Sequence, residues 1–322
     1  MYQPAEHILW DAWFVEVDGI HHAYYLQAPK GLADPEQRHT MAEVGHAVSR
    51  DLVTWEERGT AFSQGRPGSF DDGSVWSGSV AVHDGLAHFF YTGISRAHGY
   101  TLQRIGHAVS DDLDRFVRVT TEPILDADPA WYETTGGPDG NLHWRDPHPV
   151  IVDGRVHLYI TARSNRGPWD ERGTIALATS DDWRHWIVHP PVAELGHFWM
   201  MEVPQVLERA DRWWLVASAS AAWHSQRRRG AGAGDAHGGL VVYVADAPTG
   251  PYRPARDAFL LGDPLGSHYT GKIVATPDGD RLVASRFLDA TGAFVGELSD
   301  PLDVEWRADG PHIDAAGLPR GG

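Results

Sequence analysis

Apolar and polar positions alternate along most of this chain, in short runs that come in pairs such as Leu9 to Val17 and Ile20 to Leu26. Alternation with a period of two is typical of β-strands with one buried face. Four of the pairs enclose an Asp-Gly step, at residues 18–19, 84–85, 153–154 and 278–279. Asp-Gly favours a two-residue hairpin turn because both residues tolerate positive φ. The pattern therefore predicts an all-β fold built from hairpins.

The hairpins belong to a repeat, in which each unit has an opening hairpin, a loop and two shorter strands. Gly-His-Ala-Val-Ser, for example, occurs at residues 45–49 and again at 106–110. Landmarks in the first strand of the five units are 65, 70, 56 and 67 residues apart: Asp11, Trp76, Asp146, Glu202 and Tyr269. Five such units predict a five-bladed β-propeller of four-stranded antiparallel blades, forming a single domain over residues 1–322.

Some local details of this propeller also follow from the pattern. The fourth unit lacks Asp-Gly, so we expect a less regular turn between residues 202–207 and 213–218. We expect the last strand of the first unit at residues 54–56 and that of the fifth at 304–306. The glycine-rich stretch from Ala219 to Gly239 is expected to be a disordered segment or a mobile lid, with Arg227 to Arg229 as a solvated loop tip.

The connections on one face are long, for example residues 28–43, 120–144 and 219–238, whereas the hairpin turns on the other face are short. Long loops usually mark the functional face. Asp11, Asp146 and Glu202 begin inner strands on that face and are taken to share one phase of the repeat, so we expect them to converge at the propeller axis. Paired carboxyl groups of this kind are what glycoside hydrolysis requires. A structural alternative stays open for each: a hydrogen-bonded acid in an apolar strand, or an ion pair between Arg145 and Asp146.

Composition narrows the range of partners. A formal charge of −17 argues against nucleic acid or an anionic membrane as partner. The chain has no cysteine, which excludes disulfides and zinc-thiolate sites. Histidine is abundant, at 19 residues, but pairs such as His21-His22 alternate across a strand and lack the facing spacing of a zinc site. We expect no catalytic metal and no cofactor, and a structural calcium or a central water-bound ion stays open. The start of the chain lacks the pattern of a secretory signal, so a cytoplasmic protein is expected, with its oligomeric state open.

Several motifs resemble those of a known group of enzymes. Trp10-Asp11-Ala12-Trp13, Arg145-Asp146-Pro147-His148 and Glu202-Val203-Pro204-Gln205 are similar, in order and spacing, to the three acidic motifs of glycoside hydrolase families 32 and 68. The segments Gly45 to Trp55 and Trp76 to Ser79 resemble further family 32 signatures. These families are five-bladed propellers acting on β-fructofuranosides. The resemblance implies that Asp11 is the nucleophile, Asp146 the transition-state stabiliser and Glu202 the acid/base of a retaining mechanism.

The chain departs from both families in places. Its first motif resembles family 68 more than family 32, and no length remains for the C-terminal β-sandwich usual in family 32. We expect a hydrolase or transferase acting on sucrose or short fructo-oligosaccharides. Two alternatives stay open: an inverting arabinofuranosidase or xylosidase similar to family 43, and a non-catalytic sugar-binding propeller. The predicted substrate-binding residues are Trp10, Gln27, Trp76, Ser77, Arg145 and Tyr269.

Overall fold

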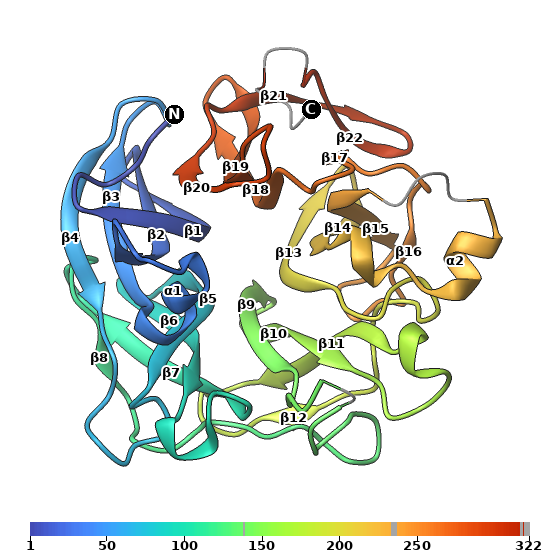
Figure 1. Ribbon diagram of the computed structural model, residues 1–322, viewed down its shortest axis with the longest axis horizontal. Coiled ribbons are helices and arrows are strands. Elements are labelled where there is room, and N and C mark those ends of the chain that lie inside the picture. Colours follow the sequence, from blue (N-terminus) through green and yellow to red (C-terminus); the bar gives the residue numbers. More distant parts are fainter. Residues whose placement is uncertain (138, 233–236, 316–317, 319–322) are drawn as a thin grey trace.

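Five antiparallel sheets surround a central axis in the computed structural model (Figure 1), which describes residues 1–137, 139–232, 237–315 and 318. The innermost strands of neighbouring sheets contact one another around the axis. This confirms the predicted five-bladed propeller. Among the described residues, no helix is long and apolar enough to cross a membrane.

The first three blades each have four strands in chain order from the axis outward. Blade one contains β1 (His7–Val17), β2 (Ile20–Pro29), β3 (Glu43–Ser49) and β4 (Glu56–Phe62). Blade two contains β5 (Ser74–His83), β6 (Leu86–Ile94), β7 (Gln103–Ser110) and β8 (Val117–Arg118). Blade three contains β9 (Trp144–Val152), β10 (Arg155–Arg163), β11 (Gly173–Ser180) and β12 (Ile187–Val188).

Blades four and five carry additional short strands. Blade four contains β13 (Glu202–Arg209), β14 (Arg212–Ala219), β15 (Gly238–Ala245) and β16 (Arg253–Pro254), with β17 (Leu261–Asp263) also paired to β15. Blade five contains β18 (His268–Thr276), β19 (Gly279–Leu288), β20 (Phe294–Leu298), β21 (Leu302–Arg307) and β22 (Gly310–Ile313).

Two of the predicted outer strands were wrong. The last strand of blade one begins at Glu56, where the predicted range ended. In blade five, Ser285 pairs with Leu298 and Leu282 pairs with Leu302, so β20 and β21 lie in line along one edge of β19. Residues 304–306 therefore belong to the third position of that blade, and β22 supplies the fourth.

The hairpin turns follow the prediction in three blades. Asp18-Gly19, Asp84-Gly85 and Asp153-Gly154 each occupy the two turn positions with φ between 50° and 78°. In blade four the prediction of a less regular turn was wrong, because Ala210 and Asp211 form the same two-residue turn with φ of 54° and 57°. In blade five the Asp-Gly prediction was wrong, because Gly279 already pairs with Thr276 and the turn residues are 277–278.

Each innermost strand is interrupted by a β-bulge near its start. The register shifts between Trp10 and Trp13, Trp76 and Gly78, Arg145 and His148, Glu202 and Gln205, and Tyr269 and Lys272. Four bulges contain a residue with positive φ: Asp11 (48°), Asp146 (55°), Val203 (51°) and Thr270 (48°). Bulges of this kind redirect a side chain out of the pleat of the sheet. They place polar groups at the axis of an otherwise apolar core.

The ring closes between blades five and one. Tyr2 forms an antiparallel bridge with Leu298, and Leu9 packs in one apolar cluster with Val274 and Val283. Burial of these aliphatic side chains stabilises the closure at roughly 25 cal/mol per Å² of apolar surface. All four strands of blade one come from one continuous segment, so the Tyr2–Leu298 bridge and side-chain packing together join the two ends.

Short helices occupy two of the long connections. Helix α1 (Arg38–Met41) lies between β2 and β3, and α2 (Gln226–Gly230) lies between β14 and β15 (Figure 1). Arg228 in α2 is buried, with its guanidinium 4.8 Å from the ring centroid of Phe198. The prediction of a solvated arginine run was therefore wrong for Arg228, whereas Arg227 and Arg229 are exposed as predicted. Residues 233–236 of the predicted lid lie outside the described residues.

Candidate active site

A cavity of about 480 Å³ opens at the axis on the face of the long loops. Its size is within the range of small-molecule sites. Eight of the nine predicted site residues line it: Trp10, Asp11, Trp76, Ser77, Arg145, Asp146, Glu202 and Tyr269. All eight come from the bulged part of an innermost strand. The structure thus gathers the predicted acids at one place.

The bulges also show that the three acids do not share one phase of the repeat. Asp11 and Asp146 are the first residues inside their bulges, equivalent to Val203 in blade four. Glu202 is the last paired residue before its bulge, equivalent to Arg145 in blade three. The assumption of a common phase was wrong by one residue. Glu202 consequently reaches the cavity from the strand position that Arg145 occupies in blade three, one residue before the position of Asp11 and Asp146.

Asp11 is held through one of its two carboxylate oxygens. The hydroxyl of Ser77 donates to Oδ2 of Asp11 at 2.5 Å. Burial raises the pKa of Asp11 to about 7, the Ser77 hydrogen bond opposes this rise, and the charges of Glu202 and Asp146 add to it. A carboxyl group among other acids in a poorly solvated site behaves in this way because its ionised form is disfavoured. Asp11 therefore changes charge close to neutral pH.

Arg145 joins the other two acids. Its Nη2 donates to Oε2 of Glu202 at 2.8 Å, and its Nε lies 3.3 Å from Oδ2 of Asp146. Asp146 also accepts from the main-chain N–H of Val203 at 3.2 Å. Burial raises the pKa of Asp146 to about 6, and Arg145 is the main opposing influence. The predicted ion pair exists, but it lies inside the cavity and includes both acids.

Lys272 supplies a second buried cation near the acids. Its ammonium group donates to the main-chain oxygens of Val203 at 2.6 Å and Pro204 at 3.2 Å, within the bulge that follows Glu202. Burial lowers the pKa of Lys272 to about 8, and the carboxyl groups of Asp11 and Asp146 oppose that change. The charged amine thus supports the ionised forms of both aspartates.

Aromatic residues form the walls of the cavity. The indole of Trp76 is only partly buried, and its Nε1 donates to the main-chain oxygen of His39 at 2.7 Å, which ties the wall to helix α1. Tyr269 is buried beside Glu202, and burial followed by the charge of Glu202 raises the pKa of its hydroxyl well above the ordinary value. The hydroxyl therefore stays protonated beside the acid.

Gln27 does not belong to this site, so that prediction was wrong. Its side chain is buried and donates to Oε1 of Glu43 and to the hydroxyl of Thr60, both at 3.0 Å. Gln27 does lie on the functional face, at the end of β2, as predicted. Its side chain, however, binds neighbouring strands of its own blade. Its role in the structure is to join β2, β3 and β4.

Sequence reasoning missed several residues of the site. Gln103 and His143 line the cavity and contact Arg145, and Trp223 also lines it. Lys272 is not part of the lining but interacts electrostatically with Asp11 and Asp146. His143 precedes Arg145 by two residues, and the period of two along a strand was a usable signal that both face the same side. Lys272 had another signal, since a single lysine within an apolar strand is rarely buried without a partner.

Among the described residues, no group of three or more His, Cys, Asp or Glu side chains is arranged to hold a metal ion. The carboxylates of the site are instead accompanied by Arg145 and Lys272.

Residues 3–240 match the model of the glycosyl hydrolases family 32 N-terminal domain. The chain belongs to glycosyl hydrolase family 32. Its relatives include the insoluble β-fructofuranosidase isoenzyme CWINV6 of Arabidopsis thaliana, which is 30% identical over 196 residues, or 58% of this chain and 32% of that protein. Raffinose invertase of Escherichia coli is 24% identical over 209 residues, or 62% of this chain and 39% of that protein. The chain thus spans about a third of the length of these curated relatives.

Solved structures extend the similarity of this family 32 chain beyond residue 240. Inulosucrase from Halalkalicoccus jeotgali bound to kestose superposes with a TM-score of 0.77 at 23% identity, covering 97% of this chain and 88% of that one. Bacillus subtilis levansucrase gives 0.76 at 16% identity, covering 99% and 88%. At such identities the likeness shows the fold alone. The family match favours family 32 over the alternative of family 43.

Proposed function

We propose that this protein cleaves or transfers β-fructofuranosyl units of sucrose or short fructo-oligosaccharides with retention of configuration. The observation that carries the proposal is the arrangement of Asp11, Asp146 and Glu202 in one cavity, with Arg145 contacting the last two. Family 32 membership and relatives named β-fructofuranosidase and raffinose invertase support the choice of sugar.

In the first half of the reaction, one carboxylate oxygen of Asp11 attacks the anomeric carbon as the glycosidic bond breaks. Ser77 binds Oδ2, so Oδ1 is the oxygen we expect to attack. Glu202 gives its proton to the departing oxygen through Oε1, because Oε2 accepts from Arg145. In the second half, the oxygen of water, or of a sugar hydroxyl in transfer, attacks the anomeric carbon while the Glu202 carboxylate takes its proton. The bond from that carbon to Asp11 breaks and restores the Asp11 carboxylate.

Asp146 fits the part of a residue that binds ring hydroxyls. Its Oδ2 is used by Arg145 and by the N–H of Val203, and its side chain is nearly inaccessible except from the cavity. A carboxylate held on one side and facing the sugar on the other strengthens its hydrogen bonds as positive charge develops on the ring.

The leaving group has a second space beside the acid. A further cavity of about 560 Å³ shares Arg38, Glu202, Trp223, Tyr269 and Phe287 with the first and extends over blade five to Leu265 and Phe294. Because a general acid lies next to the oxygen it protonates, the leaving sugar or an acceptor sugar would enter this side. The combined space suits a disaccharide or a short oligosaccharide.

The proposal is tested with a substrate panel of sucrose, kestose, inulin, levan and an aryl arabinoside. We expect fructose release from sucrose and kestose, and abolished turnover in Glu202→Gln. Release from the arabinoside alone would contradict the assignment to fructosides. If the parent protein turns over no glycoside but both it and Glu202→Gln bind fructosides equally well by calorimetry, the sugar-binding alternative replaces the enzyme.

Cytoplasmic location and a single-domain organisation stay predictions.

A further inference from the structure

The guanidinium of Arg145 makes contacts of opposite kinds on its two sides. One side faces the carboxylates of Asp146 and Glu202. On the other side, Nη1 donates to Oε1 of Gln103 at 2.9 Å and to Nδ1 of His143 at 2.6 Å. Gln103 is uncharged, and a His143 that accepts through Nδ1 is uncharged as well. Two neutral acceptors therefore orient the guanidinium without neutralising its charge, which only Asp146 and Glu202 balance among these contacts.

The protonation state of His143 follows from its two neighbours. Its Nε2 lies 3.0 Å from Oδ2 of Asp139, which can only accept. A proton on Nδ1 would point at an N–H of Arg145, so the ring proton must reside on Nε2. Burial, followed by the charge of Arg145, lowers the pKa of His143 to about 3. Asp139 thus selects the one tautomer of His143 that can accept from Arg145.

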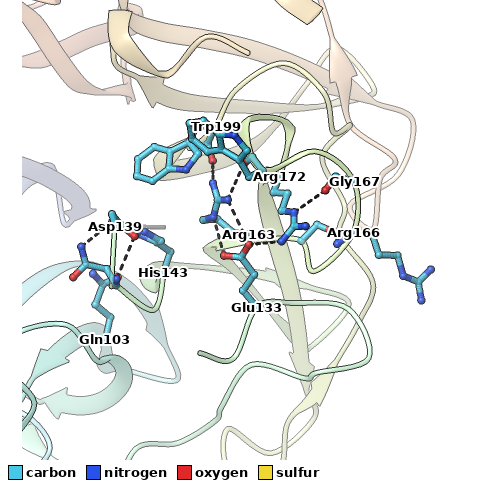
Figure 2. A network of polar contacts seen from close by, with 12 residues as sticks. Gln103, Glu133, Asp139, His143, Arg163, Arg166, Gly167, Arg172 and Trp199 are labelled. Carbon is cyan, nitrogen blue, oxygen red and sulfur yellow. Dashed lines mark hydrogen bonds and ion pairs between the residues drawn. The ribbon is translucent and has the colours of Figure 1, made fainter. Parts of the chain in front are cut away.

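The imidazole ring is also held from the side, as Figure 2 shows. The ring of Trp199 packs edge-on against His143, with centroids 5.5 Å apart at 80°. The main-chain oxygen of Trp199 accepts from Arg163, whose Nε donates to Glu133 at 2.8 Å. Arg163 is almost completely buried. This buried network fixes the loop before β13 and, through Trp199, the orientation of His143.

We propose that His143 and Asp139 are positioning residues, which fix the guanidinium of Arg145 and through it the orientation of the acid Glu202. This inference rests on the proposed function, because it assigns Glu202 the protonation of the leaving group. Without the acceptor at Nδ1, one N–H of Arg145 loses its partner, and the guanidinium can rotate away from Oε2 of Glu202. The defect should appear in kcat for substrates that need a proton, with little change in KM.

A matched pair of substitutions distinguishes the role of Nδ1 of His143 from that of Nε2. In His143→Asn the side-chain oxygen occupies about the place of Nδ1 and still accepts from Arg145, whereas His143→Gln places its polar atoms near Nε2. We expect His143→Gln to lower kcat for sucrose about 10- to 100-fold and His143→Asn to lower it no more than about 3-fold. For an aryl fructofuranoside, whose leaving group departs without a proton, the loss in His143→Gln should be smaller. His157→Asn, a buried histidine of β10, is the control for the exchange itself.

Equal losses in His143→Asn and His143→Gln would overturn the inference, as would a loss confined to KM or one of equal size for both substrates. A second measurement does not depend on turnover. Nitrogen-15 NMR of the parent protein should show His143 neutral with its proton on Nε2, and Asp139→Ala should admit the other tautomer. A proton on Nδ1 in the parent would refute the arrangement even in an active enzyme. Absence of fructosidase activity with the expected tautomer would refute the proposed function alone.

Discussion

The hydroxyl of Ser77 donates to Oδ2 of Asp11 across the boundary between blades two and one, at 2.5 Å. This bond favours the ionised form of Asp11, in opposition to burial. In Ser77→Ala the pKa of Asp11 should therefore rise further. The acidic limb of kcat/KM should move to higher pH by roughly 1 to 2 pH units, because a hydrogen bond to a charged group contributes that much. An unmoved acidic limb would show that Asp11 is not the group titrating there.

Lys272 should also influence the acidic limb of the pH dependence of kcat/KM. Lys272→Met removes a charge that supports ionised Asp11, so the acidic limb should again move to higher pH. The carbonyls of Val203 and Pro204 also lose their donor, which should lower the free energy of unfolding by about 1 to 3 kcal/mol. Lys30, the only other lysine, is exposed, and Lys30→Met is the control. A loss of stability with an unchanged pH profile would reduce Lys272 to a structural role.

A stability measurement on Asp11→Asn tests burial of the charge independently of activity. The folded-state pKa of about 7 lies above the ordinary 3.8, so the folded protein binds the extra proton and loses stability as pH rises through this range. The Asp11→Asn variant has no such group to titrate and does not lose this stability as pH rises. It should exceed the parent in free energy of unfolding at pH 8 by on the order of 1 to 3 kcal/mol, a range reduced because solvent reaches Asp11 from the cavity. The difference should largely vanish near pH 4, and a variant less stable than the parent at pH 8 would contradict this account.

How far the sequence predicts this structure depends on whether a feature is local. Asp18-Gly19 specifies its own turn, since both residues accept positive φ. Such turns in phase, together with the spacing of one landmark residue per unit, predicted five blades. Ala210 adopts positive φ in the same turn without any such preference, because strands on both sides impose it. At Asp278-Gly279 the local preference was overridden by the register of β18 and β19.

Most residues of the site were predictable from the sequence, but their exact positions relative to the β-bulges were not. Alternation along a strand placed Asp11, Asp146 and Glu202 near the axis. The point at which a bulge begins leaves no trace in the pattern, so the phase of Glu202 was misjudged by one residue. Gln27 was assigned from its position at a strand end, which does not determine where a long side chain finds its partners. Lys272 binds carbonyls 68 and 69 residues away, a contact that only the closed ring creates.

Substitution of Trp76 should affect mainly KM and substitution of Trp13 mainly stability, although both residues belong to inner strands. Trp76 lines the cavity and is only partly buried, so Trp76→Ala should raise KM about 10-fold with a modest loss of stability. Trp13 is 1% exposed and stacks on Phe89 with centroids 5.5 Å apart. Trp13→Ala should cost about 3 to 5 kcal/mol of stability. Thermal unfolding and kinetics on both variants check the contrast, which fails if Trp76→Ala leaves KM unchanged.

The stereochemical outcome follows from the part assigned to Asp11. A nucleophile requires a separation of roughly 5 to 5.5 Å between its carboxyl group and that of the acid, whereas an inverting enzyme needs about 6.5 to 9.5 Å to admit water. We predict the shorter separation between Asp11 and Glu202, since Ser77 and Arg145 each hold one carboxylate oxygen at the wall of the same cavity. Proton NMR of the first product, recorded before mutarotation, should show the β-anomer of fructose. The α-anomer at early times would make Asp11 a general base that activates water, and no covalent intermediate should then accumulate with a slow substrate.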